Sequence, residues 1–159
     1  GFASQPQYKG KLKLAGDTFS KENYGVGLMK GNTDLCNKVT EAIKAMILVD
    51  MIADRDLNLR RESTSTKWLT DAVWNSARTL GLGRHVLDEE MPIEDDHVPF
   101  LEARIPAVDL IDFDYPPWHT AGDTLDQVSA GSLEIVGTVL LDALPAIERR
   151  LSPTAGAGR

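Results

Sequence analysis

The sequence predicts an α/β fold, in which one domain contains a mostly parallel β-sheet with helices on both faces. From Tyr24 onward, short segments with a strand pattern alternate with longer segments of helical periodicity. Such alternation is typical of parallel strands joined by helical crossovers. The chain has 159 residues, of which 42% are hydrophobic and 26% charged, values typical of one globular domain with an apolar core. We expect this domain to span residues 1–150.

The charge and the residue counts restrict the function. A net charge of −7 argues against a nucleic-acid surface or an anionic membrane as partner. No apolar run approaches the ~18 residues of a membrane span. The single cysteine, Cys36, excludes an internal disulfide and a cysteine-rich zinc site. Residues 151–159 are small and polar, with glycine and proline, and we expect a disordered tail.

The first predicted elements are two strands, a helix and a third strand. Residues 11–15 alternate between polar and apolar, and residues 24–29 form a glycine-containing strand. Asn32 or Thr33 then caps a helix with an apolar stripe that reaches Met46. Residues 46–52 are apolar except for one aspartate, which predicts a central strand buried on both faces. Residues 54–62 are polar, and we expect a loop there.

The next predicted element is a helix that begins at Ser65 or Thr66 and ends before Gly81 and Gly83. Its expected inward residues are Trp68, Leu69, Ala72, Val73, Ser76, Ala77 and Leu80. Residues 85–88 form a short strand.

Two helices and a strand complete the expected order. Asp95 or Asp96 caps a short helix that ends at Ala103, and residues 107–112 form another strand. The last helix begins at Ser129 or Ser132, and Pro145 bends or shortens it. Its expected inward residues are Leu133, Val136, Leu140, Ala143, Leu144 and Ile147.

The segment around His119 contains the first candidate site residues. An imidazole that follows a buried strand, with Trp118 beside it and carboxylates around it, suits a metal ligand next to a small apolar pocket. Trp118 would form one wall of that pocket. The alternative is a loop in which Asp123 and Thr124 only cap turns.

Asp50 is the second candidate, because a lone carboxylate in an apolar strand is costly if it is buried without a partner. A metal, a cation or several hydrogen bonds would offset that cost. At the carboxyl end of a strand it would lie where α/β sheets bind ligands. The alternative is a carboxylate that caps a neighbouring helix.

Asp95 and Asp96 are the third candidates, in an acidic run that ends at His97. They could hold a metal-bound water or a substrate amine, with His97 orienting them. Spacing alone favours the alternative, in which Asp95 or Asp96 is a helix N-cap and the other charges are solvated.

Four motifs in order carry a family resemblance over residues 43–147. They are ILVDMIAD at 47–54, EDDHVPFL at 94–101, IPAVDLI at 105–111, and WHT with DTLD at 118–126. This part of the chain resembles the C-terminal half of the zinc-dependent aminopeptidase fold, in its glutaminyl-peptide cyclotransferase branch.

The resemblance implies a role for each candidate. Asp50 would bind a second metal or contact the substrate, and His119 would be a zinc ligand. Asp95 or Asp96 would belong to the catalytic hydrogen-bond network, and Trp118 would line the pocket for an N-terminal glutamine. The implied reaction closes a peptide's N-terminal glutamine to pyroglutamate with release of ammonia, while zinc polarises the side-chain carbonyl and a glutamate shuttles protons.

Residues 8–42 carry a different resemblance. KLKLAGD at 11–17, YGVGL at 24–28 and KGNTDL at 30–35 are similar to the C-terminal part of bacterial polar-amino-acid-binding proteins. In the cyclase family, the proton-shuttling glutamate and further zinc ligands precede the strand that matches Asp50. The two resemblances together predict a chimera with a seam near residue 42. Both parent families are mostly extracytoplasmic.

Three functions follow from these resemblances. The first is a recombined or truncated domain with a partial active site and no turnover. The second is a working zinc-dependent cyclotransferase or aminopeptidase, acting on a small peptide, whose missing ligands come from unrecognised residues or a partner chain. The third is an amino-acid-binding module. A zinc site needs three or four protein ligands and the resemblance supplies only Asp50 and His119, so we expect weak or absent zinc binding and favour the first.

We also expect self-association, as a homodimer or a larger homo-oligomer. A domain that lacks half of the parent sheet exposes a strand edge or an apolar surface. Sedimentation should therefore show a mass that rises with protein concentration. A monomer at every concentration would count against this expectation.

Overall fold

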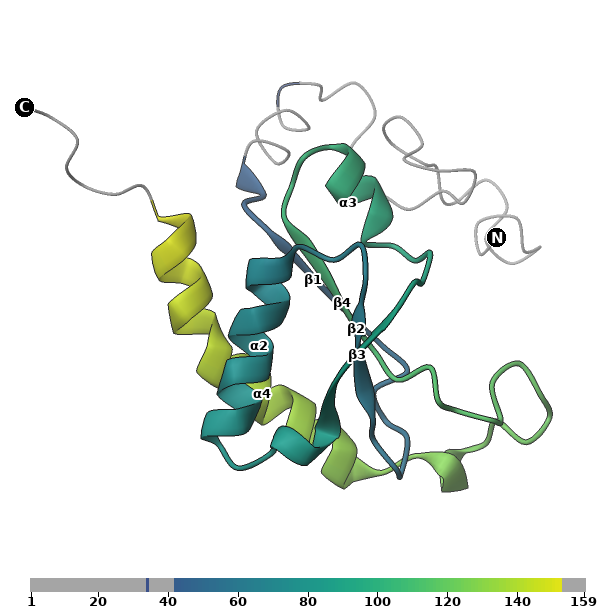
Figure 1. The fold of residues 1–159 in the computed structure, drawn as a ribbon. Coiled ribbons are helices and arrows are strands. Elements are labelled where there is room, and N and C mark those ends of the chain that lie inside the picture. The colour runs from purple at the N-terminus through teal and green to yellow at the C-terminus, as the bar shows by residue number, and fades with distance from the viewer. Residues whose placement is uncertain (1–33, 35–41, 153–159) are drawn as a thin grey trace, which may run out of the picture. The chain divides into compact units, whose positions relative to one another are not determined.

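The computed structural model describes residues 34 and 42–152. The described residues from Lys44 onward belong to one compact unit, shown in Figure 1. The strands expected at 11–15 and 24–29, most of the helix expected after Asn32, and residues 153–159 of the expected tail lie outside the described residues.

The strands of this unit pair in parallel, as the alternating pattern predicts. β1 (Met46–Asp50) pairs with β4 (Ala107–Ile111), from Met46 opposite Ala107 to Asp50 opposite Ile111. β2 (Leu59–Glu62) pairs with β3 (Val86–Met91), with an irregularity between Leu59 and Arg61. A short 3₁₀ turn, η3 (Gly83–His85), precedes β3, so the expected strand begins one residue later and extends further.

The strand that is buried at every residue is β4, and the expectation that 46–52 is buried on both faces is wrong. β1 ends at Asp50, and its last two residues are exposed, with Val49 42% accessible. β4 is the partner of β1 among the described strands, so the other edge of β1 is not covered by a described strand. Apolar composition alone could not distinguish these two strands.

The polar segment 54–62 is not a loop throughout, because its last four residues form β2. Leu59 and Glu62 are buried, and the two arginines between them are paired with carboxylates. Arg60 pairs with Glu89 and Asp114, and Arg61 pairs with Asp71 and Asp88. These ion pairs allow a polar sequence to form a strand inside the domain.

Helix α2 (Lys67–Thr79) starts after Thr66, as predicted, and the chain leaves it through Gly81, whose φ of 74° suits glycine. Trp74, which the predicted inward face lacked, is fully buried and donates its indole N–H to the Leu87 carbonyl at 3.0 Å. Leu80, predicted inward, is exposed because it follows the last turn of the helix.

Helix α4 (Ala130–Leu151) is capped by Ser129, whose side chain accepts the Ser132 N–H at 3.4 Å. Pro145 lies within the helix and does not end it. Leu133 and Leu144, predicted inward, are exposed, because each follows a buried residue by one position and is turned about 100° away from it. The buried stripe of α4 consists of Ser132, Val136, Val139, Ala143 and Ile147.

Among the described helices, α4 is the one with the length and hydropathy of a membrane span. That property does not distinguish a span from a core helix, and the buried stripe of α4 packs in the core of this unit.

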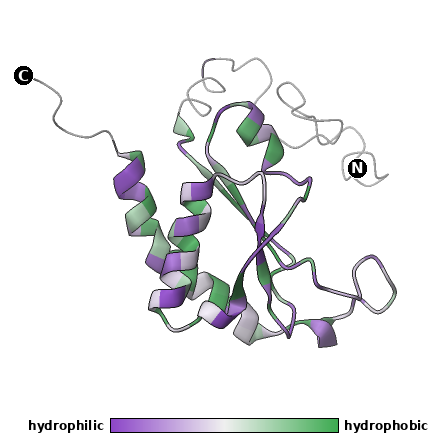
Figure 2. Ribbon diagram, in the orientation of Figure 1, coloured by the Kyte–Doolittle hydropathy of each residue, from purple (hydrophilic) through white to green (hydrophobic). Residues whose placement is uncertain are grey.

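Helices α2 and α4 lie on one side of the strands (Figure 1), and hydrophilic and hydrophobic residues alternate along both (Figure 2). Their inner faces pack with Val108 and Leu110 of β4 in the core. Helix α3 (Val98–Glu102) lies on the other side of the strands, where Asp109 of β4 faces. A 3₁₀ turn, η4 (Leu125–Gln127), precedes α4.

Candidate functional site

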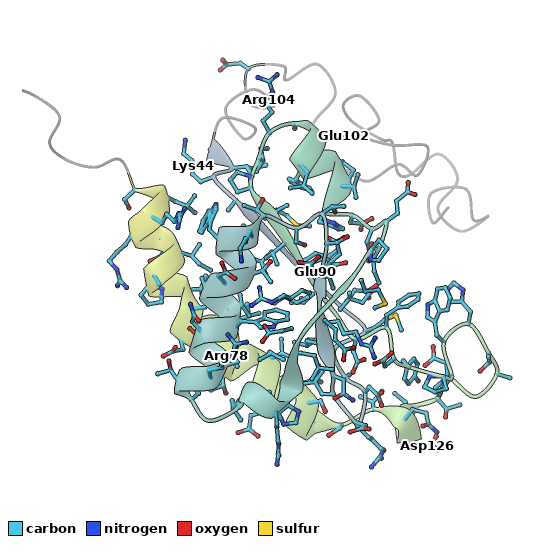
Figure 3. The ribbon with its side chains drawn as sticks, in the orientation of Figure 1. Lys44, Arg78, Glu90, Glu102, Arg104 and Asp126 are labelled. Atoms are coloured by element: carbon cyan, nitrogen blue, oxygen red, sulfur yellow. The ribbon has the colours of Figure 1, made fainter. Side chains whose placement is uncertain are left out.

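The carboxyl ends of β1 and β4 meet at the same end of the sheet. The register places Leu48 opposite Asp109 and Asp50 opposite Ile111, so Asp50 and Asp109 are on the same face of the strand pair. Figure 3 shows Asp126 beside the loops at this end, whereas Lys44 and Arg104 lie toward the other end. Parallel sheets place their ligand sites outside the carboxyl ends of the strands.

A pocket of about 190 Å³ lies at this end. Three carboxylates and two aromatic rings contribute to its wall, and two of these residues, Asp50 and Trp118, are predicted site residues. The lining residues are Asp50, Met51, Ala53, Asp54, Tyr115, Trp118, Asp123, Gln127 and Val128. The structure therefore brings Asp50 and Trp118 to one cavity.

Trp118 packs against two other rings. Its centroid lies 4.9 Å from that of Phe113, at an interplanar angle of 57°, and 4.0 Å from that of His119, at 20°. His119 adopts the left-handed conformation, with φ of 56°, and its ring stacks on the indole. His119 is exposed and is not among the residues that line the pocket, so it is linked to the pocket through Trp118.

Side-chain hydrogen bonds shape the loop that carries Trp118. The Tyr115 hydroxyl donates to the Asp123 carboxylate at 2.7 Å, and that hydrogen bond raises the pKa of Tyr115 to about 12. The Thr120 hydroxyl donates to the Pro117 carbonyl at 2.6 Å and accepts the Gly122 N–H at 3.1 Å. The Thr124 hydroxyl donates to the Asp126 carboxylate. The Asp123 carboxylate thus bonds a tyrosine hydroxyl, and Thr124 precedes η4 without a side-chain capping hydrogen bond, so neither side chain has the expected turn-capping role.

Asp50 is exposed at the end of β1, so it is not a buried carboxylate that needs a partner. Its Oδ1 accepts the N–H of Met51 at 2.9 Å. Met51 itself has φ of 50°, so the backbone turns sharply directly after the strand.

Asp95 and Asp96 are not the caps of α3, and that prediction is wrong. His97 occupies the N-cap position of α3, and the Asp95 Oδ1 instead accepts the Asp96 N–H at 2.7 Å. Neither aspartate lines the pocket of Asp50 and Trp118. Both lie close enough to Asp109 to act on its pKa, so they belong to a second group of charges behind the pocket.

Glu62 is a buried member of that second group, although it belongs to the polar segment 54–62 that was expected to form a loop. Its carboxylate accepts the N–H and hydroxyl of Thr64, the N–H and hydroxyl of Ser65, and the N–H of Ile93. Burial acts to raise the pKa of Glu62, but these hydrogen bonds outweigh it and hold the pKa below its usual value. Glu62 is therefore a buried carboxylate ion.

His97 and Asp109 complete the group. His97 is fully buried, with Nε2 3.0 Å from the Glu62 Oε2 and 3.0 Å from the Thr64 hydroxyl. Asp109 is 1% exposed, and neither of its carboxyl oxygens has a hydrogen-bond partner within the part of the chain that the structure describes. Burial first, and then the charges of Asp95, Glu62, Asp50 and Asp96, raise the pKa of Asp109 to about 7.

The sequence held a signal for Asp109. An aspartate stands within the apolar run 107–111, just as Asp50 stands within 46–52. Asp109 therefore has the same sequence context as Asp50, and only the structure shows that Asp109 is the buried one.

The described residues do not complete a zinc site. Within residue 34 and residues 42–152, no group of three or more His, Cys, Asp or Glu side chains could hold a metal ion. Asp50 and His119 are two candidate ligands, whereas zinc takes three or four from the protein.

Comparison with known proteins identifies the fold and the family. The model of peptidase family M28 matches residues 9–144. A glutaminyl-peptide cyclotransferase from Boiga irregularis is 26% identical over 113 residues, which is 63% of this chain and 31% of that protein. The chain thus spans about a third of the length of this curated relative.

Two solved structures are similar to the described fold. A glutaminyl cyclase from an Acidobacteriales bacterium is 38% identical with a TM-score of 0.69, over 74% of this chain and 43% of its own. A Zn-dependent exopeptidase from Parabacteroides distasonis is 25% identical with a TM-score of 0.60, over 64% and 39%. The predicted α/β class is confirmed.

The M28 match also includes residues 9–42, the segment that was expected to resemble amino-acid-binding proteins. That resemblance, and the chimera inferred from it, have no support from the comparisons.

The raised pKa of Asp109 predicts how stability depends on pH. Because the folded protein binds the Asp109 proton more tightly than the unfolded chain does, this group contributes stability at pH 4 that is lost as the pH rises toward 7. Asp109→Asn cannot ionise, so its free energy of unfolding should fall less than that of the wild type between pH 4.5 and 8, by on the order of 2–4 kcal/mol.

Urea unfolding at several pH values measures this difference. Glu134→Gln, a change at an exposed position of α4, is the control and should follow the wild type. If the free energy of unfolding changed with pH to the same extent in Asp109→Asn and in the wild type, the prediction would be wrong.

Proposed function

Because the chain belongs to peptidase family M28, we propose that it carries part of a glutaminyl-cyclase or aminopeptidase type of site that binds the N-terminus of a small peptide. The observation that carries this proposal is the pocket at the carboxyl end of β1, where carboxylates and aromatic rings share one wall. Among the relatives, a bacterial glutaminyl cyclase has the same fold at 38% identity.

The pocket suits both the ammonium group and the side chain of an N-terminal residue. Asp50, Asp54 and Asp123 place negative charge on one wall, which favours a peptide's ammonium group. The Trp118 ring, which packs against Phe113 and His119 and lines the pocket, offers an apolar wall against which an uncharged side chain can pack. A side-chain amide such as that of glutamine fits such a wall without bringing a further charge.

The buried charges behind the pocket would handle protons in such a reaction. Asp95 and Asp96 lie near Asp109, whose raised pKa allows it to take up or release a proton near neutral pH. We propose Asp95 and Asp96 as members of this catalytic network and Asp50 and His119 as metal ligands.

We further propose that the described residues form only part of the site. Two candidate ligands are too few for zinc, so the 159-residue chain should bind zinc weakly or not at all and should show no measurable turnover. The alternative is a working zinc-dependent cyclotransferase or aminopeptidase, completed by ligands from other residues or from a partner chain.

Peptide binding tests the pocket directly. A short peptide with an N-terminal glutamine should shift the indole N–H resonance of Trp118 in nuclear magnetic resonance spectra. Trp118→Leu should weaken binding by about tenfold, the cost of losing an aromatic contact of roughly 1.4 kcal/mol. Trp68→Phe, on α2 and away from the pocket-lining residues, is the matched control and should bind like the wild type. Equal affinity for all three proteins would refute a binding role for this pocket.

Metal analysis and an activity assay separate the partial site from a working enzyme. After dialysis against zinc-containing buffer and then metal-free buffer, we expect well under one zinc per chain and no pyroglutamate formation from a glutaminyl peptide. One zinc per chain, with turnover that His119→Ala abolishes, would establish the working enzyme instead.

A further inference from the structure

Glu62, His97 and Asp109 form a buried carboxylate–imidazole–carboxylate chain, which we call the buried triad. Its members come from the end of β2, the N-cap of α3 and the middle of β4, and none is more than 4% exposed. It lies behind the pocket and shares no residue with the pocket wall.

The Glu62 side of the triad fixes one proton on the imidazole. Glu62 is ionised and accepts hydrogen bonds only. The Thr64 hydroxyl donates its hydrogen to the Glu62 Oε2 at 2.9 Å, so towards His97 it can act only as an acceptor. The His97 Nε2 lies 3.0 Å from both oxygens and therefore carries a hydrogen.

The Asp109 side of the triad has three atoms without partners. The His97 Nδ1 lies 3.8 Å from the Asp109 Oδ2, and neither this nitrogen nor either Asp109 oxygen makes a hydrogen bond among the described residues. With Nε2 protonated, a neutral imidazole presents Nδ1 as an acceptor, and an ionised Asp109 is also an acceptor. Two buried acceptors that face each other are unfavourable, so a proton on either of them is favoured. At 3.8 Å the two atoms are not hydrogen-bonded, and a small side-chain rotation that closes this gap would let the proton bond the other atom.

The surrounding charge favours that proton. Four carboxylates act on Asp109, namely Asp50 at the end of β1, Glu62 at the end of β2, and Asp95 and Asp96 in the loop before α3. Among the described residues, His97 is the basic group that pairs with the Asp109 carboxylate within 4 Å. These four carboxylates therefore disfavour a further negative charge on Asp109.

We propose that His97 and Asp109 together hold one proton, on Nδ1 or on Oδ2, and that His97, anchored by Glu62, is the positioning residue for Asp109. When the proton moves from one atom to the other, one N–H or O–H bond breaks and the other forms, and no other bond changes. Below the pH at which this proton leaves, the triad has one negative charge. Above that pH it has two. The use of this proton in catalysis rests on the proposed function, whereas its existence does not.

Carboxyl-carbon and imidazole-nitrogen resonances test the proposal without peptide, zinc or turnover. In protein labelled with ¹³C at aspartate and ¹⁵N at histidine, we expect the Asp109 carboxyl carbon to titrate and the His97 Nδ1 resonance to change over the same pH range, as expected for two coupled groups. The variants Asp109→Asn and His97→Gln assign the two resonances.

His97→Gln is the decisive variant. Its amide can still reach Glu62, but no ring nitrogen faces Asp109, so protonated Asp109 loses its acceptor. The Asp109 midpoint should fall by about one pH unit, the equivalent of one hydrogen bond. In Asp109→Asn, the change in the His97 Nδ1 resonance at the wild-type midpoint should disappear.

His85→Gln is the matched control, because the ring nitrogen of His85 is bonded to the Leu57 carbonyl and not to the triad. It should leave the Asp109 midpoint unchanged. A folded His97→Gln with an unmoved Asp109 midpoint would overturn the proposal. If that variant does not fold, a His97 Nδ1 resonance that stays constant through the Asp109 midpoint of the wild type would overturn it equally.

Discussion

The buried carboxylate of Glu62 joins the parts of this domain that carry its polar chemistry. It accepts hydrogen bonds from Thr64 and Ser65, between β2 and α2, and from Ile93, between β3 and α3. Through the Ser65 hydroxyl, which also accepts the Asp109 N–H at 3.0 Å, the same network reaches β4. An ionised group at this depth is tolerated only because its hydrogen bonds offset the cost of burial.

Strand β4 separates two environments because its side chains alternate. Val108 and Leu110 face α2 and α4 and are part of the apolar core, whereas Asp109 faces the opposite side, where His97 and Glu62 lie. The apolar side supplies the stability that holds the strand in place. The polar side places carboxylates at fixed positions behind the end of β1, which is what a site that handles protons requires.

Two groups of residues thus have different roles in the proposed site. The pocket of Asp50 and Trp118 faces solvent and has the charge and the aromatic surface to hold a peptide's N-terminus. The buried triad lies behind it and holds groups whose protonation the interior controls. The chain covers 43% of the Acidobacteriales glutaminyl cyclase, so the activity of a complete protein of this family is a proposal for this chain.

Periodicity in the sequence was sufficient for the α/β class and for α2 and α4 with their starts, because these depend on local spacing. It was not sufficient for β2, whose arginines are satisfied by ion pairs with residues far along the chain. Nor could it show which of two aspartates in apolar strands is buried, since that depends on which strand is covered from both sides. The sequence by itself determined the α/β class and the positions of α2 and α4, and only the tertiary structure decided which polar residues meet, because Glu62, His97 and Asp109 come together through packing between distant segments.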